Sequence, residues 1–234
     1  MLGIAYGMGS MVRQVVQSFA GDYSPAVSTP VPAGTEYLSV KELGTQMAQP
    51  GGLTSASLVA YLQERIGRLD PQLSSVIELN PQALETALEL DRERDSGKVR
   101  GPLHGLPVLL KDAIETERMQ TSAGAFGLVG AAAGKNAPLV DYLIEQGAVS
   151  LGKTNMTERA GFPGGPGGWS SRGGPTRTPH QSDADVGWSS SGSAAAVAAG
   201  LAPLAVGAET NGSIIVPAAR NGIVGLKPTV GLLD

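Results

Sequence analysis

The segment GLPVLLKD (residues 105–112) is a short apolar run that ends in a lysine and an aspartate. A run of this length between a glycine and charged residues predicts a buried β-strand that ends at Lys111 and Asp112. Residues 139–147 predict a helix that a glycine closes, and AVSLG (residues 148–152) predicts a second buried strand. Strand, helix and strand with short connections indicate an α/β layer, in which functional groups gather at the strand ends.

Two helices are predicted upstream of this layer. The first starts at Thr54 or Ser55 and carries four apolar residues at helical spacing, namely Leu58, Leu62, Ile66 and Leu69. The second starts with Asn80 as its N-cap and Pro81 in its first turn, and it ends near Gly97. We expect both helices to pack over the sheet, because neither carries residues that suggest chemistry.

Downstream of the layer, residues 161–192 are rich in glycine, proline, serine and threonine and show little periodicity. Such a stretch inside a compact domain is typical of a functional or a disordered segment. Residues 193–200 then predict a helix of small residues that can pack very close to a neighbour. Serines before an alanine-rich helix are usually caps, so Ser190 or Ser193 is expected to cap it.

The sequence predicts an α/β fold with a mixed central β-sheet covered by helices. Residues 204–207 and 223–226 add two further apolar strands to the prediction. Residues 1–35 form a predicted N-terminal extension of poor order, because they end in a proline-rich and glycine-rich stretch. The domain itself is expected to span residues 36–234.

The composition excludes several classes of protein. The 234 residues include no cysteine, which excludes disulfide scaffolds, thiolate metal sites and thiol nucleophiles. Only two histidines are present, so a histidine-rich metal site is excluded too, and we expect neither metal nor cofactor. The net charge of −4 comes without a basic stripe for nucleic acid, and no apolar run approaches the length of a membrane span.

Three features point together to acyl transfer: a lysine at the end of a buried strand, a Gly/Ser loop that runs into a helix, and a serine after a glycine turn. Acyl transfer needs a nucleophile, a base and backbone N–H groups for the oxyanion. Because histidine is nearly absent, a lysine is the natural base, and burial at Lys111 would favour its neutral form. Gly212 lets the chain turn sharply before Ser213, the candidate nucleophile.

Each of these residues also has a structural alternative. A lysine after an apolar strand is usually solvated, Ser189 can be part of a helix cap, and Ser213 can be a turn residue. Four other polar residues are expected to hold loops through hydrogen bonds rather than to react, namely His104, Lys153, Asn155 and Lys227.

Four blocks together resemble the amidase signature family: GPLHGLPVLLKD (101–112), LGKTNMTE (151–158), SSSGSAAAVAAG (189–200) and GAETNGSIIVPAARNGIVGLKPTVG (207–231). The resemblance runs from about residue 38 to the last residue, and the blocks keep the family's order and spacing. It implies a triad of a lysine, a serine held by a cis peptide bond and a nucleophilic serine, here Lys111, Ser189 and Ser213. Ser213 follows Ser189 by 24 residues, as the family pattern expects.

The resemblance implies an amidase that hydrolyses a small, linear, non-peptide carboxamide through an acyl-enzyme on Ser213. Neutral Lys111 takes a proton from Ser189 while Ser189 takes one from Ser213. Backbone N–H groups hold the oxyanion, and the candidates are those of Thr210, Asn211 and Gly212. The variant ETNGS (residues 209–213) looks closer to the peptide-amidase and fungal-type branches than to the tRNA-dependent amidotransferase subunits.

The sequence departs from the family pattern at three positions near the expected site. Trp188 and Ser191 each stand where the family usually has a glycine, and Asn211 replaces a glycine or an aspartate. Family members are also roughly twice as long as this chain. Their C-terminal half normally supplies further strands of the sheet and much of the acyl pocket.

Two other functions are alternatives to an active amidase. One is a catalytically inactive, truncated amidase-like protein that acts as a binding or scaffold protein. The other is an A-type amidotransferase subunit that releases ammonia from glutamine and passes it to a partner. The expected partners are a small-molecule amide and either a second copy or another chain that supplies the missing half. We expect a cytoplasmic protein, because the N-terminal apolar run lacks a basic start and the sequon at Asn211 lies inside the expected site.

Overall fold

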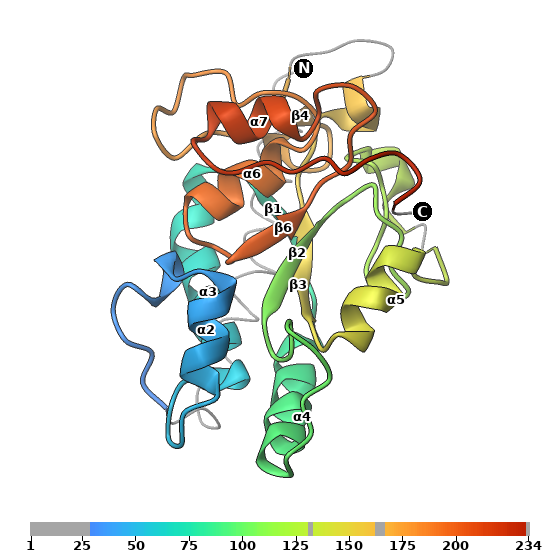
Figure 1. The fold of residues 1–234 in the computed structure, drawn as a ribbon. Coiled ribbons are helices and arrows are strands. Elements are labelled where there is room, and N and C mark those ends of the chain that lie inside the picture. The colour runs from blue at the N-terminus through green and yellow to red at the C-terminus, as the bar shows by residue number, and fades with distance from the viewer. Residues whose placement is uncertain (1–28, 131–132, 162–166, 233–234) are drawn as a thin grey trace.

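The computed structural model describes residues 29–130, 133–161 and 167–232 (Figure 1). Most of the predicted extension, residues 1–28, lies outside the described residues, and so do residues 162–166 of the predicted loop. Thr35 is buried at the start of a short 3-10 helix, η1 (Thr35–Tyr37). Glu36 in this turn forms an ion pair of 3.2 Å with Arg65.

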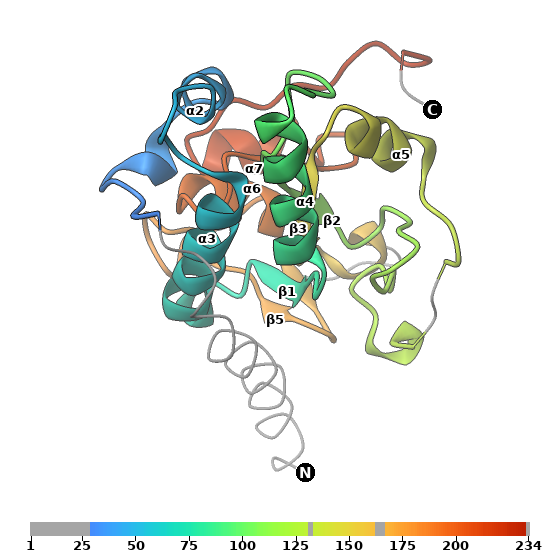
Figure 2. The ribbon, with the colours of Figure 1, turned by 90° about the horizontal axis from the view of Figure 1, so that it is seen from below.

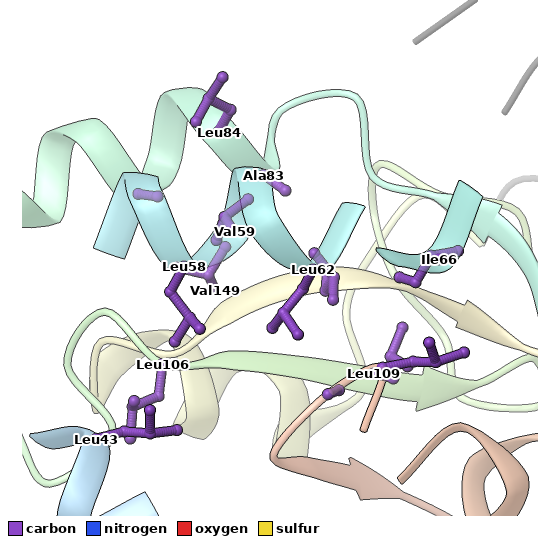
Figure 3. Close-up of a cluster of buried hydrophobic side chains, with 14 of the residues drawn as sticks. Leu43, Leu58, Val59, Leu62, Ile66, Ala83, Leu84, Leu106, Leu109 and Val149 are labelled. Atoms are coloured by element: carbon purple, nitrogen blue, oxygen red, sulfur yellow. The ribbon is translucent and has the colours of Figure 1, made fainter. Parts of the chain in front are cut away.

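The central sheet has four strands in the order β1–β3–β2–β6 and is mixed, as predicted. β2 (Pro107–Lys111) is parallel to both of its neighbours, β3 (Val149–Thr154) and β6 (Leu204–Val206). β1 (Val76–Leu79) is antiparallel to β3 and was not predicted, because its four residues make too short a pattern. Figure 3 shows the arrows of β2 (green), β3 (yellow) and β6 (orange) pointing in the same direction.

Six α-helices surround this sheet in the described residues: α2 (Val40–Met47), α3 (Ser55–Leu69), α4 (Ala83–Asp95), α5 (Pro138–Glu145), α6 (Ser191–Ala198) and α7 (Ile215–Arg220). Short 3-10 turns lie between them, namely η2 (Asp70–Gln72), η3 (Phe126–Leu128) and η4 (Glu158–Gly161). A two-stranded hairpin, β4 (Trp169–Ser170) with β5 (Gly174–Pro175), lies in the predicted loop.

The two predicted upstream helices are present, but the second starts later than expected. α3 begins after Thr54, whose hydroxyl accepts a hydrogen bond from the Ser57 N–H in a capping box. Asn80 does not cap α4 directly. Its side chain accepts from the Gln82 N–H at 3.0 Å and its carbonyl accepts from the Ala83 N–H at 3.1 Å, so a turn precedes the helix.

The hydrophobic core lies on both faces of the sheet, because β2 alternates its side chains between them. Leu109 belongs to the larger cluster, which α2, α3 and α4 help to enclose (Figure 3). Val108 and Leu110 belong to a smaller cluster that Val140 of α5 closes on the opposite face. A strand buried on both faces is a continuous apolar run, which explains the sequence of residues 106–110. The helices lie accordingly on the two sides of the sheet in Figure 1.

The prediction of a strand at residues 223–226 is wrong. The segment after α7 has no regular structure as far as residue 232, and in Figure 2 it runs along the outside of the molecule (red). Val224 is 95% exposed and Leu226 is 79% exposed, so no neighbouring strand covers them in the described residues. An apolar segment forms a strand only where a ladder partner is present, and apolar character alone does not reveal that partner.

Candidate active site

Three polar segments follow the carboxyl ends of the parallel strands. Lys111 is the last residue of β2, Thr154 is the last residue of β3, and the loop after β6 leads to Ser213. The carboxyl ends of parallel strands meet at one edge of a sheet, so these segments converge there. α6 is tied to the same edge, because the Ser193 hydroxyl shares a hydrogen bond of 2.7 Å with that of Thr154 and donates to the Val206 carbonyl at 3.1 Å.

The amino group of Lys111 is buried at this edge of the sheet, and only 1% of the residue is exposed. Its Nζ lies 2.6 Å from Ser189 Oγ, 3.1 Å from Ser190 Oγ and 3.0 Å from the Ala208 carbonyl oxygen. Burial lowers the pKa of Lys111 from 10.5 to about 8, although the negative charge of Glu209 raises it. At pH 7 roughly a tenth of the molecules would therefore hold a neutral Lys111, against about three in ten thousand for an ordinary lysine.

Ser189 and Ser190 reach Lys111 because α6 begins directly after them, two residues earlier than predicted. Ser190 occupies the N-cap position, yet its hydroxyl caps no N–H group of the helix. It donates to the Ala208 carbonyl and accepts from the Ala208 N–H, both at 3.2 Å. The predicted capping by Ser190 or Ser193 is therefore wrong, since both hydroxyls tie α6 to neighbouring strands and loops instead.

Ser213 lies beside this pair but is joined to it only through the backbone. The Ser190 N–H donates to the Ser213 carbonyl oxygen at 3.1 Å, which brings the two segments together. Ser213 is 8% exposed, and within the part of the chain that the structure describes its hydroxyl makes no hydrogen bond. The structure thus brings Lys111 and Ser189 into direct contact and holds the Ser213 backbone beside Ser190.

The turn before Ser213 is held by Glu209. Its carboxylate accepts hydrogen bonds from three backbone N–H groups, those of Gly212 at 2.8 Å, Ile214 at 2.7 Å and Ile215 at 3.0 Å. Burial raises the pKa of Glu209, but these three bonds together with the charge of Lys227 outweigh burial, so its pKa is lowered overall. Glu209 is therefore a carboxylate at neutral pH and fixes the shape of the turn.

This anchoring divides the backbone N–H groups of the turn into two kinds. The N–H of Gly212 is taken by Glu209, whereas those of Thr210, Asn211 and Ser213 donate no hydrogen bond to any residue that the structure describes. Gly212 has a φ of +74°, the left-handed conformation that favours glycine and turns the chain sharply. Of the three predicted oxyanion donors, Thr210 and Asn211 keep a free N–H group, and Gly212 secures the turn.

Sequence reasoning missed Glu209 and Ser190. A carboxylate shortly before a glycine turn and a helix is a recognisable signal, because backbone N–H groups at a helix start attract negative charge. That signal was present in residues 209–215. No pattern in the sequence indicates that Ser190 lies beside Lys111. This contact depends on where α6 meets the loop after β6.

A second buried lysine, Lys153, lies at the end of the neighbouring strand. Its Nζ donates to the Ile114 carbonyl at 2.6 Å and to Thr121 Oγ1 at 3.1 Å, which confirms the predicted loop-holding role. Burial lowers the pKa of Lys153 to about 8, and the charges of Asp112 and Glu78 oppose that shift. Unlike Lys111, it contacts no serine of the predicted triad.

Of the other three residues predicted to hold loops, Asn155 and His104 do so, whereas Lys227 makes only an exposed bond to its neighbour in the chain within the described residues. Asn155 donates to the Ser74 carbonyl at 3.0 Å, and His104 Nε2 lies 2.9 Å from the Leu90 carbonyl. Lys227 donates to the carbonyl oxygen of the next residue at 3.0 Å. Burial lowers the pKa of His104, as expected for a neutral ring that holds two segments together.

Among the described residues, no three side chains of His, Asp or Glu gather closely enough to hold a metal ion. In the same part of the chain, no helix combines the length and the apolar character needed to cross a membrane.

Comparison with known proteins identifies the family. The sequence profile of the amidase family matches residues 57–233. The chain belongs to the amidase family. The peptide amidase from Stenotrophomonas maltophilia has a similar structure, with a TM-score of 0.82 and 52% identity over 86% of this chain and 42% of that chain.

Two relatives are similar in sequence. An Arabidopsis thaliana protein named as a probable amidase is 47% identical over 185 residues, which cover 77% of this amidase-family chain and 36% of the relative. A glutamyl-tRNA(Gln) amidotransferase subunit of Thermobifida fusca is 44% identical over 197 residues, which cover 83% of the chain and 38% of the relative. The chain thus spans between a third and two fifths of the length of these relatives. The predicted family and α/β fold are confirmed, and the higher identity to the peptide amidase agrees with the branch predicted from ETNGS.

Proposed function

We propose that this amidase-family chain hydrolyses a small, linear carboxamide through an acyl-enzyme, with Ser213 as nucleophile, Ser189 as proton bridge and Lys111 as base. The observation that carries the proposal is the buried contact of 2.6 Å between Lys111 Nζ and Ser189 Oγ. Burial lowers the pKa of this lysine to about 8, which brings its neutral form within reach at physiological pH. Lys153 is buried as deeply and has a similar pKa, but its Nζ contacts no serine of the proposed triad, so the contact with Ser189 is what distinguishes Lys111.

The acylation step transfers two protons and forms one bond. Ser213 Oγ attacks the amide carbon while its proton passes to Ser189 Oγ, and the proton of Ser189 passes to neutral Lys111 Nζ. The carbonyl oxygen becomes an oxyanion, which the free N–H groups of Thr210 and Asn211 would stabilise. One well-placed donor of this kind lowers the activation barrier by about 3–4 kcal/mol.

The intermediate then collapses through the same three residues. The proton returns from Lys111 through Ser189 to the leaving nitrogen, the C–N bond breaks, and ammonia departs. Water attacks the ester on Ser213 by the same relay and releases the carboxylic acid. The relay requires the Ser213 hydroxyl to turn toward Ser189 when substrate binds, since catalytic hydrogen bonds often tighten only in the complex.

A second candidate function is that of an amidotransferase component that releases ammonia from glutamine. The observation in its favour is the 44% identity to the glutamyl-tRNA(Gln) amidotransferase subunit of Thermobifida fusca. It would use the same three side chains and would differ in its need for a partner protein. Efficient turnover of glutamine by the isolated chain would contradict this candidate.

Labelling with a fluorophosphonate tests the proposed nucleophile. We expect intact-mass spectrometry to show one adduct per chain, and peptide mapping to place it on Ser213. The adduct should disappear in Ser213→Ala and persist in Ser96→Ala, in which a surface serine that bonds only within its own turn is removed. A folded chain that stays unlabelled would instead support the inactive, scaffold-like alternative.

A further inference from the structure

Trp188 is a large apolar side chain that is 47% exposed directly beside the candidate triad. Half-exposed aromatic side chains are common on protein surfaces and need no explanation when they stand alone. This one precedes Ser189 in the chain and contacts the turn that carries Ser213, so the residue adjoins the candidate reaction centre.

The backbone before Trp188 is tightly held. Asp185 accepts from the Gly187 N–H at 2.8 Å and forms an ion pair of 3.1 Å with Arg220 of α7. The buried side chain of Asn221 donates to the Val186 carbonyl at 3.1 Å. The chain leading to Trp188 is thus anchored to α7 at two places.

The backbone after Trp188 is held as well. The Ser189 carbonyl accepts from the Thr157 N–H at 3.2 Å, and the Ser190 N–H donates to the Ser213 carbonyl at 3.1 Å. Trp188 therefore projects from a backbone fixed on both sides. A side chain held in this way can bind a ligand with little loss of conformational entropy.

The indole ring packs against Gly212. A Cβ atom added to Gly212 would lie 2.8 Å from Cζ3 and 2.9 Å from Cε3 of Trp188, so the ring edge fills the space that a side chain would need. One edge of the ring is therefore seated on the residue before the candidate nucleophile, while about half of the residue stays open to solvent.

The charged groups that hold this region are already paired. Glu209 accepts three backbone N–H groups, and Asp185 is paired with Arg220. A ligand that approaches Ser213 along the ring thus meets an apolar surface, and the charged groups nearby already have hydrogen-bond or ion-pair partners. Such a surface favours an uncharged group with apolar area, and an aromatic ring gains additional stacking energy on an indole.

We propose that Trp188 is a specificity-determining residue that forms one wall of the acyl-binding site and favours carboxamides with an aromatic or bulky apolar group next to the carbonyl. This inference rests on the proposed function, because it assumes that Ser213 is the reacting residue. Phenylacetamide and acetamide are a matched pair of probes, since they differ only by the phenyl ring that the wall would contact.

Binding is tested first, without turnover. The chain has two tryptophans, so Trp169→Phe leaves Trp188 as the sole indole, and Ser213→Ala prevents reaction. We expect phenylacetamide to change the emission of Trp188 saturably in this double variant, and acetamide to do so only at much higher concentration. Absence of any change with phenylacetamide would overturn the proposal.

Selectivity is tested next, with the active chain. We expect Trp188→Ala to lower kcat/KM for phenylacetamide about tenfold and that for acetamide less than twofold. Trp188→Phe should keep most of the selectivity, and Trp169→Phe, the matched control on the β4–β5 hairpin, should keep all of it. An equal loss of kcat/KM on both amides in Trp188→Ala would overturn the proposed role of Trp188. Unchanged kcat/KM values in that variant would overturn it too.

The two tests separate failure of this inference from failure of the proposed function. If phenylacetamide binds at Trp188 but no amide is hydrolysed and Ser213 resists the fluorophosphonate, the hydrolytic function fails and the wall stands as a binding surface. If Ser213 reacts and amides are hydrolysed without preference for the phenyl group, the proposed role of Trp188 is rejected and the hydrolytic function is retained.

Discussion

At the scale of single residues, Lys111 and Lys153 are both buried, but only Lys111 contacts a serine of the proposed triad. Burying an ammonium group is unfavourable unless an anion pairs with it, and Lys111 is surrounded by two hydroxyls and one carbonyl. Its pKa of about 8 in the folded chain lies below the value of 10.5 expected in the unfolded chain. The unfolded chain therefore binds the proton of Lys111 more tightly than the folded chain does. At every pH at which the amine is protonated in the unfolded chain, this difference lowers the stability of the fold.

We expect Lys111→Met to abolish amide turnover and to destabilise the chain far less at pH 7 than at pH 10.5. The folding penalty from the shifted pKa is fully present below pH 8 and amounts to about 3 kcal/mol, and it disappears as the pH rises toward 10.5. Methionine also loses the three hydrogen bonds of Lys111, at about 1 kcal/mol each, so the two effects nearly cancel at pH 7 and the variant is about 3 kcal/mol less stable than the parent at pH 10.5.

Urea unfolding at pH 7 and at pH 10.5 measures this difference. The exposed lysine variant Lys98→Met is the control and should change stability by less than about 0.5 kcal/mol, since Lys98 makes only a surface ion pair with Glu93. A Lys111→Met protein that is equally destabilised at both pH values would show that the buried amine carries no ionisation penalty.

Lys111, Ser189 and Ser213 could be proposed from the sequence because each lies in a motif with fixed spacing. Their mutual geometry was not, because it depends on backbone contacts between segments far apart in the chain. Ser190 shows this limit. Its place before an alanine-rich helix suggested a cap, but the approach of the Ala208 backbone gave its hydroxyl other partners.

At the scale of elements, the close approach of α6 to the strand ends positions the serines. A Cβ atom at Gly192 would collide with the Asn155 carbonyl oxygen and lie 2.5 Å from that of Ser75. The Gly192 N–H in turn donates to the Asn155 carbonyl at 3.1 Å. The absence of a side chain at this position lets the helix start next to β3 and deliver Ser189 to Lys111.

We expect Gly192→Ala to destabilise the chain by about 3 kcal/mol, because the backbone carbonyls at this contact cannot move aside cheaply. Gly44→Ala is the matched control inside α2, where a Cβ atom would meet nothing within 4 Å. That substitution should stabilise the chain by about 0.5–1 kcal/mol, because alanine favours a helix interior. Thermal unfolding of both variants tests the pair, and a Gly192→Ala protein as stable as the parent would refute the close contact.

Elements with a strong local pattern were the ones that sequence could predict. α3 has apolar residues at helical spacing and a capping box, and β2 is an apolar run buried on both faces. The prediction of a strand at residues 223–226 failed because a strand needs a neighbouring strand to pair with. The segment is apolar enough for a strand, but it lies beyond α7 without one in the described residues.

At the scale of the whole molecule, the segment after α7 leaves apolar surface exposed. Val224, Leu226, Val230 and Leu232 are all more than two-thirds exposed. Residues 223–231 also border a cavity of about 620 Å³ whose other walls include residues of α5, α6, α7 and β6 and the loop after β6. Apolar surface of this kind beside a cavity is typical of a surface that binds another apolar group.

We expect the triple substitution Val224→Ser, Leu226→Ser and Val230→Ser to reduce binding of the dye ANS at least twofold. Stability should change by less than about 0.5 kcal/mol, because these side chains are already in water. Val99→Ser, which changes an apolar residue that is 57% exposed in another part of the chain, is the control. Unchanged ANS fluorescence in the triple variant would show that this segment is not the apolar surface of the chain.

Lys111 can act as a base only if a sizeable fraction of the molecules holds it neutral at physiological pH. NMR titration of the chain with ¹³Cε-labelled lysine measures this directly, with the Lys111 signal assigned by its loss in Lys111→Met and the Lys153 signal by its loss in Lys153→Met. We expect a titration midpoint near 8 for Lys111. A midpoint near 10.5 would contradict the proposed role of Lys111, because a lysine that is almost always charged at neutral pH cannot accept the proton of Ser189.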